Sequence, residues 1–174
     1  HGPNEVHHWL ADKNLITQNI DGLDGKAGNQ DYIAIHGRLD QMTHYYEQGD
    51  MVDKIITPWH EVDESRIIQS LFDVFAIDND KPALYRSYKP FVLLFDEFYT
   101  DLYGISAAQK RMLEADKMVF MGTSFSVNIT QMALDVARSL AIPIEVVDPE
   151  PTAVMHSNVT YHRMTAQEYV QMKG

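Results

Sequence analysis

Polar side chains that can take part in chemistry follow two short apolar runs near the start of the chain. The run 15–16 leads into the polar stretch 17–21, and the run 32–35 leads into His36 and Gly37. Short apolar runs bounded by glycine and asparagine are typical of buried strands. In open parallel sheets, ligands bind at the carboxyl ends of such strands. We therefore expect the chemistry at these two strand ends, which carry two amides, a carboxylate and an imidazole: Gln18, Asn19, Asp21 and His36.

A turn in the second half of the chain is a candidate for binding phosphate. Gly122, Thr123 and Ser124 follow the apolar run 117–121 and precede a helical pattern over 130–140. Glycine leaves backbone N–H groups unobstructed, and two hydroxyl groups near a helix N-terminus suit a phosphate. Turns of this composition are common, so the turn taken alone favours an ordinary loop over a phosphate site.

Alternating strands and helices position these candidate residues. The sequence predicts strands at 14–18, 31–36, 90–95, 117–121, 142–147 and 159–162, and helices at 3–13, 64–77, 100–115, 130–140 and 165–172. Thr165 and Glu168 have the spacing of a capping box at the start of the last helix. Four residues are expected to form the apolar face of the helix 100–115: Leu102, Ile105, Met112 and Leu113. This alternation predicts an α/β fold with a doubly wound, Rossmann-like parallel sheet.

The stretch 38–88 interrupts the alternation, because it lacks a clear period outside the helical pattern at 64–77. We predict a Rossmann-like domain built from 1–37 and 89–174, with 38–88 as a small inserted module. Apolar contact must then hold the module together, which requires at least one of three aromatic residues to be substantially buried: Tyr45, Tyr46 or Trp59.

Composition argues against several classes of protein. The net charge of −11 argues against nucleic acid as a partner, because nucleic-acid binding requires clustered lysine and arginine. No run approaches the ~20 apolar residues of a membrane span, so we expect no membrane association. The chain has no cysteine and therefore no disulfide framework. We expect a cytoplasmic protein.

Several motifs, taken in order, resemble the sirtuin family of NAD-dependent protein lysine deacylases. TQNIDGL, KAG and HG at 17–37 are similar to the family's TQNIDGLH, RAG and HG. KPFVLLFDE at 89–97 is similar to R-P-x-V-V-x-F-G-E, and GTSFSV at 122–127 to G-T-S-x-x-V. The resemblance covers residues 3 to about 150 and implies NAD as cofactor. It also implies deacylation of an acyl-lysine protein or peptide, with release of nicotinamide and O-acyl-ADP-ribose.

The resemblance implies roles for the residues at the first two strand ends. Gln18 and Asn19 would hold the nicotinamide ribose and an ordered water, and Asp21 would accept a hydrogen bond from the nicotinamide carboxamide. Asn19 and His36 would be the catalytic residues. His36 would act as general base on a ribose hydroxyl, which suits an imidazole whose unperturbed pKa is ~6.5. Asp24 stands where the family has histidine.

The remaining implied site residues bind the adenosine half of NAD and the peptide. Gly122, Thr123 and Ser124 would bind the NAD phosphate and adjoining ribose, and Asp148 would contact the adenosine ribose, where sirtuins usually carry asparagine. Three residues would form the acyl-peptide site, in which the substrate adds as a strand: Leu93, Phe95 and Glu97.

Asp96 replaces a family glycine in this motif, and glycine can adopt backbone angles that are forbidden to aspartate. This departure favours an alternative activity, NAD hydrolysis or ADP-ribosyl transfer. A non-catalytic nucleotide-binding module is the third possibility.

Two further departures concern whole segments. Sirtuins carry a four-cysteine zinc ribbon where this chain has its inserted module, so we expect no metal site and a module free of zinc cysteines. The spacing of four possible ligands matches no closed structural zinc site: His44, Glu47, His60 and Asp63. The family's N-terminal G-A-G-x-S…G-I-P-D-F-R segment has no match here, and we expect residues 1–174 to be the later part of a longer chain.

Overall fold

The computed structural model describes residues 2–47, 51–94 and 97–174, and these fall into two compact units. The first unit contains the residues up to Leu15, then Leu23–Tyr32 and Ser106–Gly174. The second unit contains Ile16–Gly22 and Ile33–Ile105. Each unit is therefore assembled from segments that are separated along the chain.

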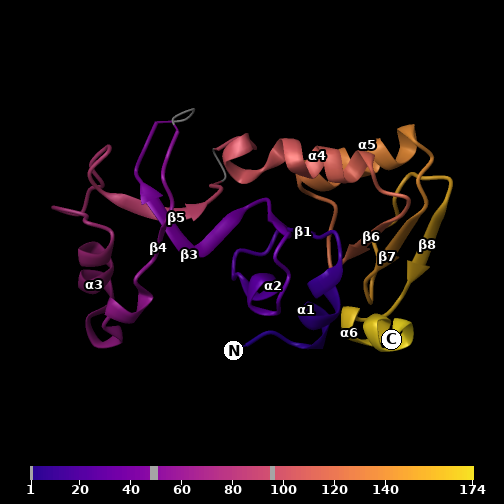
Figure 1. The fold of residues 1–174 in the computed structure, drawn as a ribbon, viewed down its shortest axis with the longest axis horizontal. Coiled ribbons are helices and arrows are strands. Elements are labelled where there is room, and N and C mark those ends of the chain that lie inside the picture. The colour runs from indigo at the N-terminus through magenta and orange to yellow at the C-terminus, as the bar shows by residue number, and fades with distance from the viewer. Residues whose placement is uncertain (1, 48–50, 95–96) are drawn as a thin grey trace. The chain divides into compact units, whose positions relative to one another are not determined.

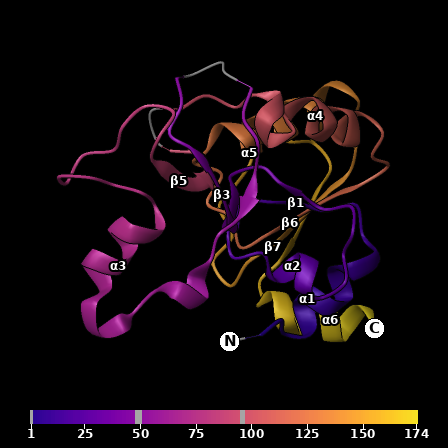
Figure 2. The ribbon, with the colours of Figure 1, turned by 60° about the vertical axis from the view of Figure 1, so that its left-hand side comes forward.

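The first unit is built on a parallel sheet. Its strands are β6 (Met118–Met121), β7 (Ile144–Val147) and β8 (Val159–His162), in the order β6-β7-β8. Helices α4 (Ile105–Leu113) and α5 (Asn128–Ser139) lie on one side of these strands (Figure 1). Helices α1 (Glu5–Trp9), α2 (Leu23–Lys26) and α6 (Ala166–Lys173) lie on the opposite side (Figures 1 and 2). Parallel strands covered by helices on both sides confirm the expected layering in this unit.

Burial follows the periodicity of the sequence in this unit. The middle strand β7 buries Ile144, Val146 and Val147 to 1% exposure, as expected for a parallel strand covered on both faces. Helix α5 buries residues spaced by one helical turn: Ile129, Ala133, Leu134 and Ala137. The α5 helix starts two residues before the predicted range 130–140, and β8 matches its predicted range 159–162.

Capping side chains set the starts of the first and last helices. The side chain of Thr165 accepts a hydrogen bond from the Glu168 backbone N–H, and Glu168 accepts one in return from the Thr165 N–H, so the predicted capping box is confirmed. Asn4 caps α1 in the same way, with His7 as its reciprocal partner. His7 is therefore a half-exposed capping residue. Trp9 meets the Tyr169 ring edge-on, with 6.2 Å between ring centroids, which joins α1 to α6.

The second unit contains two small sheets. Strands β1 (Ile16–Thr17) and β2 (Ile33–Ala34) pair in parallel. Strands β3 (Gly37–His44), β4 (Ile55–Ile56) and β5 (Tyr88–Val92) form an antiparallel sheet in the order β4-β3-β5. Helix α3 (Ile67–Val74) follows a short 3₁₀ turn at Glu64–Arg66, in agreement with the predicted helix 64–77.

One strand of the second unit was not predicted, and one predicted helix was wrong in its extent. The sequence did not predict β3, because GRLDQMTH is largely polar; pairing with β4 and β5 on both sides stabilises it, and Met42 and Thr43 are buried. The expected helix 100–115 is interrupted at Gly104, whose φ of +78° ends a 3₁₀ turn at Asp101–Tyr103. Leu113, expected on the apolar face of that helix, is 57% exposed.

Aromatic packing in the second unit differs from the expected set. Phe75, Phe91 and Tyr103 are buried, and the Phe91 and Tyr103 rings stack with 4.9 Å between centroids. Of the three aromatic residues expected to hold the module, Tyr46 is half-buried, whereas Tyr45 and Trp59 are exposed. Trp59 makes an edge contact to Phe75, and its indole N–H donates to the Leu39 carbonyl at 2.8 Å.

Among residues 2–47, 51–94 and 97–174, no helix has both the length and the apolar character needed for a membrane span.

Glu145 on β7 is expected to govern acid stability of the first unit. Its side chain, 13% exposed, accepts hydrogen bonds from Lys117 (2.8 Å), His162 (2.8 Å) and Tyr169 (2.7 Å). Burial opposes ionisation, but the bonds from Lys117 and Tyr169 and the charges of Lys117 and Lys173 lower the Glu145 pKa to about 2. A carboxyl with a depressed pKa stabilises the folded state above its unfolded pKa and loses that contribution as pH falls toward the folded pKa.

We expect Glu145→Gln to lower the free energy of unfolding at pH 7 by about 2–3 kcal/mol. The difference from the unsubstituted protein should shrink as pH falls from about 5 toward 2. Urea unfolding at a series of pH values measures both effects. Glu150→Gln, at an exposed position, is the control and should leave stability unchanged. A pH-independent difference for Glu145→Gln would contradict the assignment.

Candidate active site

The parallel pairing of β1 and β2 brings the first two candidate strand ends together. Thr17 lies opposite Ala34, and the Ile35 N–H donates to the Thr17 carbonyl at 3.0 Å. The chain therefore leaves both strands on the same edge, at Gln18 and at His36. The Gln18 carbonyl accepts a hydrogen bond from His36 Nδ1 at 3.2 Å. The sequence prediction that these residues lie together is confirmed by this contact.

His36 makes a second hydrogen bond, to a residue that sequence reasoning missed. Its Nε2 lies 2.8 Å from the Tyr99 hydroxyl, and the two rings stack with centroids 5.8 Å apart and planes 23° apart. A carbonyl can only accept, so Nδ1 carries the proton and Nε2 is left as the acceptor. Burial lowers the pKa of His36, although the bond to the Gln18 carbonyl acts to raise it. The imidazole is thus neutral at pH 7, with its basic nitrogen directed at the phenol.

The backbone around His36 connects it to a third predicted residue. The Leu93 N–H donates to the His36 carbonyl at 2.9 Å, which continues the pairing of β3 with β5. Gly37 has a φ of +80°, and an added Cβ would lie 2.1 Å from the Phe91 carbonyl oxygen. Only glycine fits there, because the β5 backbone passes directly against it. The structure therefore brings Gln18, His36 and Leu93 together within the second unit.

Glu97 was predicted as a peptide contact, but its carboxylate is occupied within the second unit. It forms an ion pair with Lys89, and it accepts hydrogen bonds from the Leu94 N–H at 2.9 Å and the Tyr103 hydroxyl at 3.3 Å. Burial raises the pKa of Tyr103, with further contributions from Tyr46 and Glu97. Phe95, predicted as a peptide contact, and Asp96, its neighbour, lie outside the described residues.

Asn19 and Asp21 lie exposed on the loop after β1. The Asn19 N–H donates to the Thr17 hydroxyl at 3.2 Å, which turns the chain and leaves the Asn19 amide at the surface. Asp24, the replacement for the family's histidine, is 3% exposed on α2 of the first unit. Asn19 and Asp21 therefore have accessible polar groups at the edge that also carries His36.

The second group of predicted residues lies in the first unit, at the carboxyl ends of β6 and β7. The Gly122 N–H donates to the Val147 carbonyl at 3.1 Å, so Gly122 and Asp148 leave neighbouring strands at the same edge. Gly122 has a φ of +58°, and no atom lies within 4 Å of the position an added Cβ would take. The space in front of this turn is open.

The polar groups at this edge fit the phosphate and ribose of a nucleotide. The Ser124 hydroxyl is exposed and bonds to the Ser126 hydroxyl at 2.7 Å, and the Thr123 hydroxyl accepts from the Phe125 N–H. One oxygen of Asp148 accepts from the Glu150 N–H at 2.8 Å, which leaves the other oxygen able to accept from a ribose hydroxyl. Hydroxyl donors, an unobstructed turn and a carboxylate form a chemically suitable donor set.

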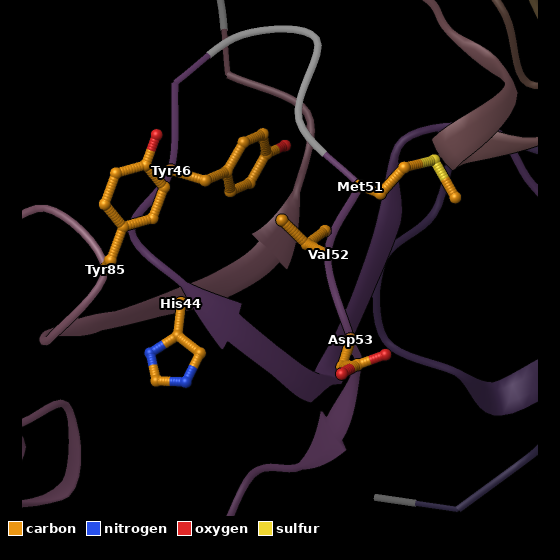
Figure 3. Close-up of a pocket in the computed structure, with 6 residues that line it drawn as sticks. All are labelled: His44, Tyr46, Met51, Val52, Asp53 and Tyr85. Atoms are coloured by element: carbon orange, nitrogen blue, oxygen red, sulfur yellow. The ribbon is translucent and has the colours of Figure 1, made fainter.

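A separate pocket of about 290 Å³ lies in the second unit (Figure 3). Six residues line it: His44, Tyr46, Met51, Val52, Asp53 and Tyr85. It contains none of the predicted site residues. Its His44 ring stacks on Tyr88, with 4.4 Å between centroids. In the described ranges, no group of three or more histidine, aspartate or glutamate side chains is arranged to hold a metal ion.

A parallel sheet covered by helices on both sides, with a glycine turn after its first strand, defines a Rossmann-like α/β protein. The chain belongs to the Sir2 family, whose family model matches residues 1–129. It is 32% identical over 155 residues to NAD-dependent deacetylase sir2E of Dictyostelium discoideum, covering 79% of this chain. It is 34% identical over 150 residues to an NAD-dependent protein deacetylase of Listeria innocua, covering 80% of this chain. The resemblance to sirtuins is confirmed.

Solved structures confirm the fold. The structure described as "Sir2-p53 peptide-NAD+" superimposes with a TM-score of 0.72 at 22% identity, over 98% of this chain and 68% of that one. A Sir2 homologue in complex with NAD gives a TM-score of 0.69 at 20% identity. The chain spans 44% of the length of the Dictyostelium relative and 57% of the Listeria relative.

Proposed function

We propose that the protein carrying this chain is an NAD-dependent protein lysine deacylase in which His36 is the general base. One observation carries the proposal. His36 is held as a neutral imidazole by the Gln18 carbonyl, with Nε2 as its basic atom, at the strand edge that carries Asn19 and Asp21. The Dictyostelium and Listeria relatives are both named NAD-dependent deacetylases, which agrees with this function.

The chain's own residues would divide the work as follows. Bound NAD would supply an electrophilic ribose carbon and nicotinamide as leaving group. Gln18, Asn19 and Asp21 would orient the nicotinamide ribose, an effect of positioning rather than of proton transfer. His36 would take a proton from a ribose hydroxyl at Nε2.

Binding of the remaining parts of the substrates is assigned to two further groups. The turn of Gly122, Thr123 and Ser124 would bind phosphate and the adjoining ribose, and Asp148 would contact the adenosine ribose. The acyl-lysine peptide would add as a strand near Leu93, which is supported by the peptide named in the similar Sir2 structure. Phe95 is part of the same proposal. Glu97 would act indirectly, by fixing the turn at Leu94 through its internal hydrogen bonds.

The protein carrying residues 1–174 should be incubated with NAD and an acetyl-lysine peptide, and with the unacetylated peptide as control. We expect O-acetyl-ADP-ribose and nicotinamide in equal amounts with the acetylated peptide only. Free ADP-ribose at the same rate with either peptide would show an NAD hydrolase instead. Binding of NAD without any turnover would show a nucleotide-binding module. Mass spectrometry of the products separates the three outcomes.

A further inference from the structure

The Tyr99 hydroxyl occupies the one atom of His36 that a general base must use. The Nδ1 proton is committed to the Gln18 carbonyl, and the only lone pair of the neutral ring in its plane is on Nε2. The Tyr99 hydroxyl lies 2.8 Å from that nitrogen and points its donor at it. A substrate hydroxyl therefore cannot donate to Nε2 directly while this bond is present.

The phenol nevertheless keeps the capacity to accept a proton. A tyrosine hydroxyl has one donor and two acceptor lone pairs, so donation to His36 leaves its oxygen able to accept from a second hydroxyl. Burial raises the pKa of Tyr99, which keeps the phenol protonated at pH 7 and makes it the donor in the bond to the neutral imidazole. The two rings stack with their planes 23° apart, which holds the Tyr99 hydroxyl beside His36 Nε2.

The hydroxyl of Tyr99 also has no structural task that competes with this contact. Within the described ranges, the Tyr99 hydroxyl makes one hydrogen bond, and its partner is His36. Tyr103, on the same stretch of chain, differs in this respect: its hydroxyl bonds to the Val92 carbonyl at 3.1 Å and to Glu97 at 3.3 Å. The Tyr103 hydroxyl thus fixes backbone, whereas the Tyr99 hydroxyl bonds to the base alone within the described part of the chain.

We propose that Tyr99 is a proton relay between His36 and the substrate hydroxyl that His36 deprotonates. The inference rests on the proposed function and adds a residue to it. The substrate O–H bond breaks as its proton passes to the Tyr99 oxygen, and the Tyr99 O–H bond breaks as its proton passes to His36 Nε2. One proton is transferred in total: the substrate becomes an alkoxide, His36 becomes an imidazolium, and Tyr99 ends as the neutral phenol with which it began.

The test uses Tyr99→Phe, which keeps the stacked ring and removes the hydroxyl. We expect its single-turnover rate of deacylation to fall about 10²-fold, at the lower end of the range for positioned proton-transfer groups, while KM for NAD and peptide stays within about twofold. Rates in mixtures of H₂O and D₂O should give a curved proton inventory for the unsubstituted protein, because two protons move together, and a straight one for Tyr99→Phe.

Tyr88→Phe is the matched control, because Tyr88 also stacks on a histidine of this unit, His44, at 4.4 Å. It should leave the rate and the curved inventory unchanged. A Tyr99→Phe variant with an undiminished rate would overturn the relay. A faster variant would show instead that Tyr99 blocks the base.

A second measurement separates failure of the relay from failure of the proposed function. In ¹⁵N-detected histidine NMR of the protein without substrates, Tyr99→Phe should shift the His36 Nε2 resonance and raise the His36 pKa, because the lost bond stabilised the neutral ring. An unchanged resonance would overturn the contact and the relay together. If the resonance shifts but the unsubstituted protein shows no deacylation, the proposed function is wrong and the relay falls with it. If the protein deacylates and Tyr99→Phe is unimpaired, only the relay is wrong.

Discussion

Replacement of His36 by alanine is expected to reduce deacylation about 10²–10⁴-fold, the range typical of a lost general base. The reason is geometric: Nε2 is the basic atom of the ring, and Nδ1 is committed to the Gln18 carbonyl. NAD binding should be retained, because the proposed phosphate and adenosine contacts lie in the first unit, at Gly122–Ser124 and Asp148. Steady-state rates and titration calorimetry measure the two properties separately.

His44→Ala is the control for this substitution, since His44 is the last residue of β3, the strand that follows His36, and its ring packs on Tyr88 rather than on the site. It should retain full activity. If His36→Ala kept more than about a tenth of the activity, the loss would be smaller than a general base contributes, and the assignment would be wrong.

Replacement of Gly37 by alanine is expected to have the largest effect on stability. The backbone φ of +80° is unfavourable for alanine by about 1–2 kcal/mol. The added Cβ would also lie 2.1 Å from the Phe91 carbonyl oxygen and 3.0 Å from the Val92 Cα, so β3 and β5 would have to separate. We expect a total loss of about 3–5 kcal/mol in the free energy of unfolding, in the range that marks a backbone clash. Denaturant unfolding measures it.

Gly122→Ala separates the two contributions. Gly122 also has a positive φ, +58°, but no atom lies within 4 Å of its added Cβ. This variant should lose only the conformational part, about 1–2 kcal/mol. Equal losses in the two variants would show that the contact between Gly37 and β5 does not limit stability.

Local signals in the sequence predicted much of the fold. Thr165 and Glu168 predicted the start of α6, because a capping box depends on two side chains three residues apart. The apolar run 142–147 predicted β7, since a strand buried on both faces is apolar throughout. Gln18 and His36 could be placed together for a similar reason: parallel neighbours end at one edge of the sheet.

Features set by long-range contacts could not be predicted. Strand β3 is polar in sequence and is a strand because β4 and β5 pair with it on both sides. Tyr99 lies just beyond the recognised motif, and nothing in its spacing indicates that its hydroxyl meets His36, 63 positions earlier. Glu97 was assigned to the substrate from its motif. Its ion-pair partner Lys89 lies eight positions away, and a separation of eight residues does not by itself indicate an ion pair.

The order of segments in the first unit has a consequence for its synthesis. Helix α1 packs against α6, where Trp9 meets Tyr169 and the Gln171 side chain donates to Glu5 at 2.8 Å. At translation rates of ~5–20 residues per second, the chain between these helices takes on the order of ten seconds to emerge. All segments of the second unit, 16–22 and 33–105, are made within that interval. Helix α1 therefore leaves the ribosome before the second unit but meets α6 only after it, and during this time the Trp9 ring lacks its Tyr169 contact.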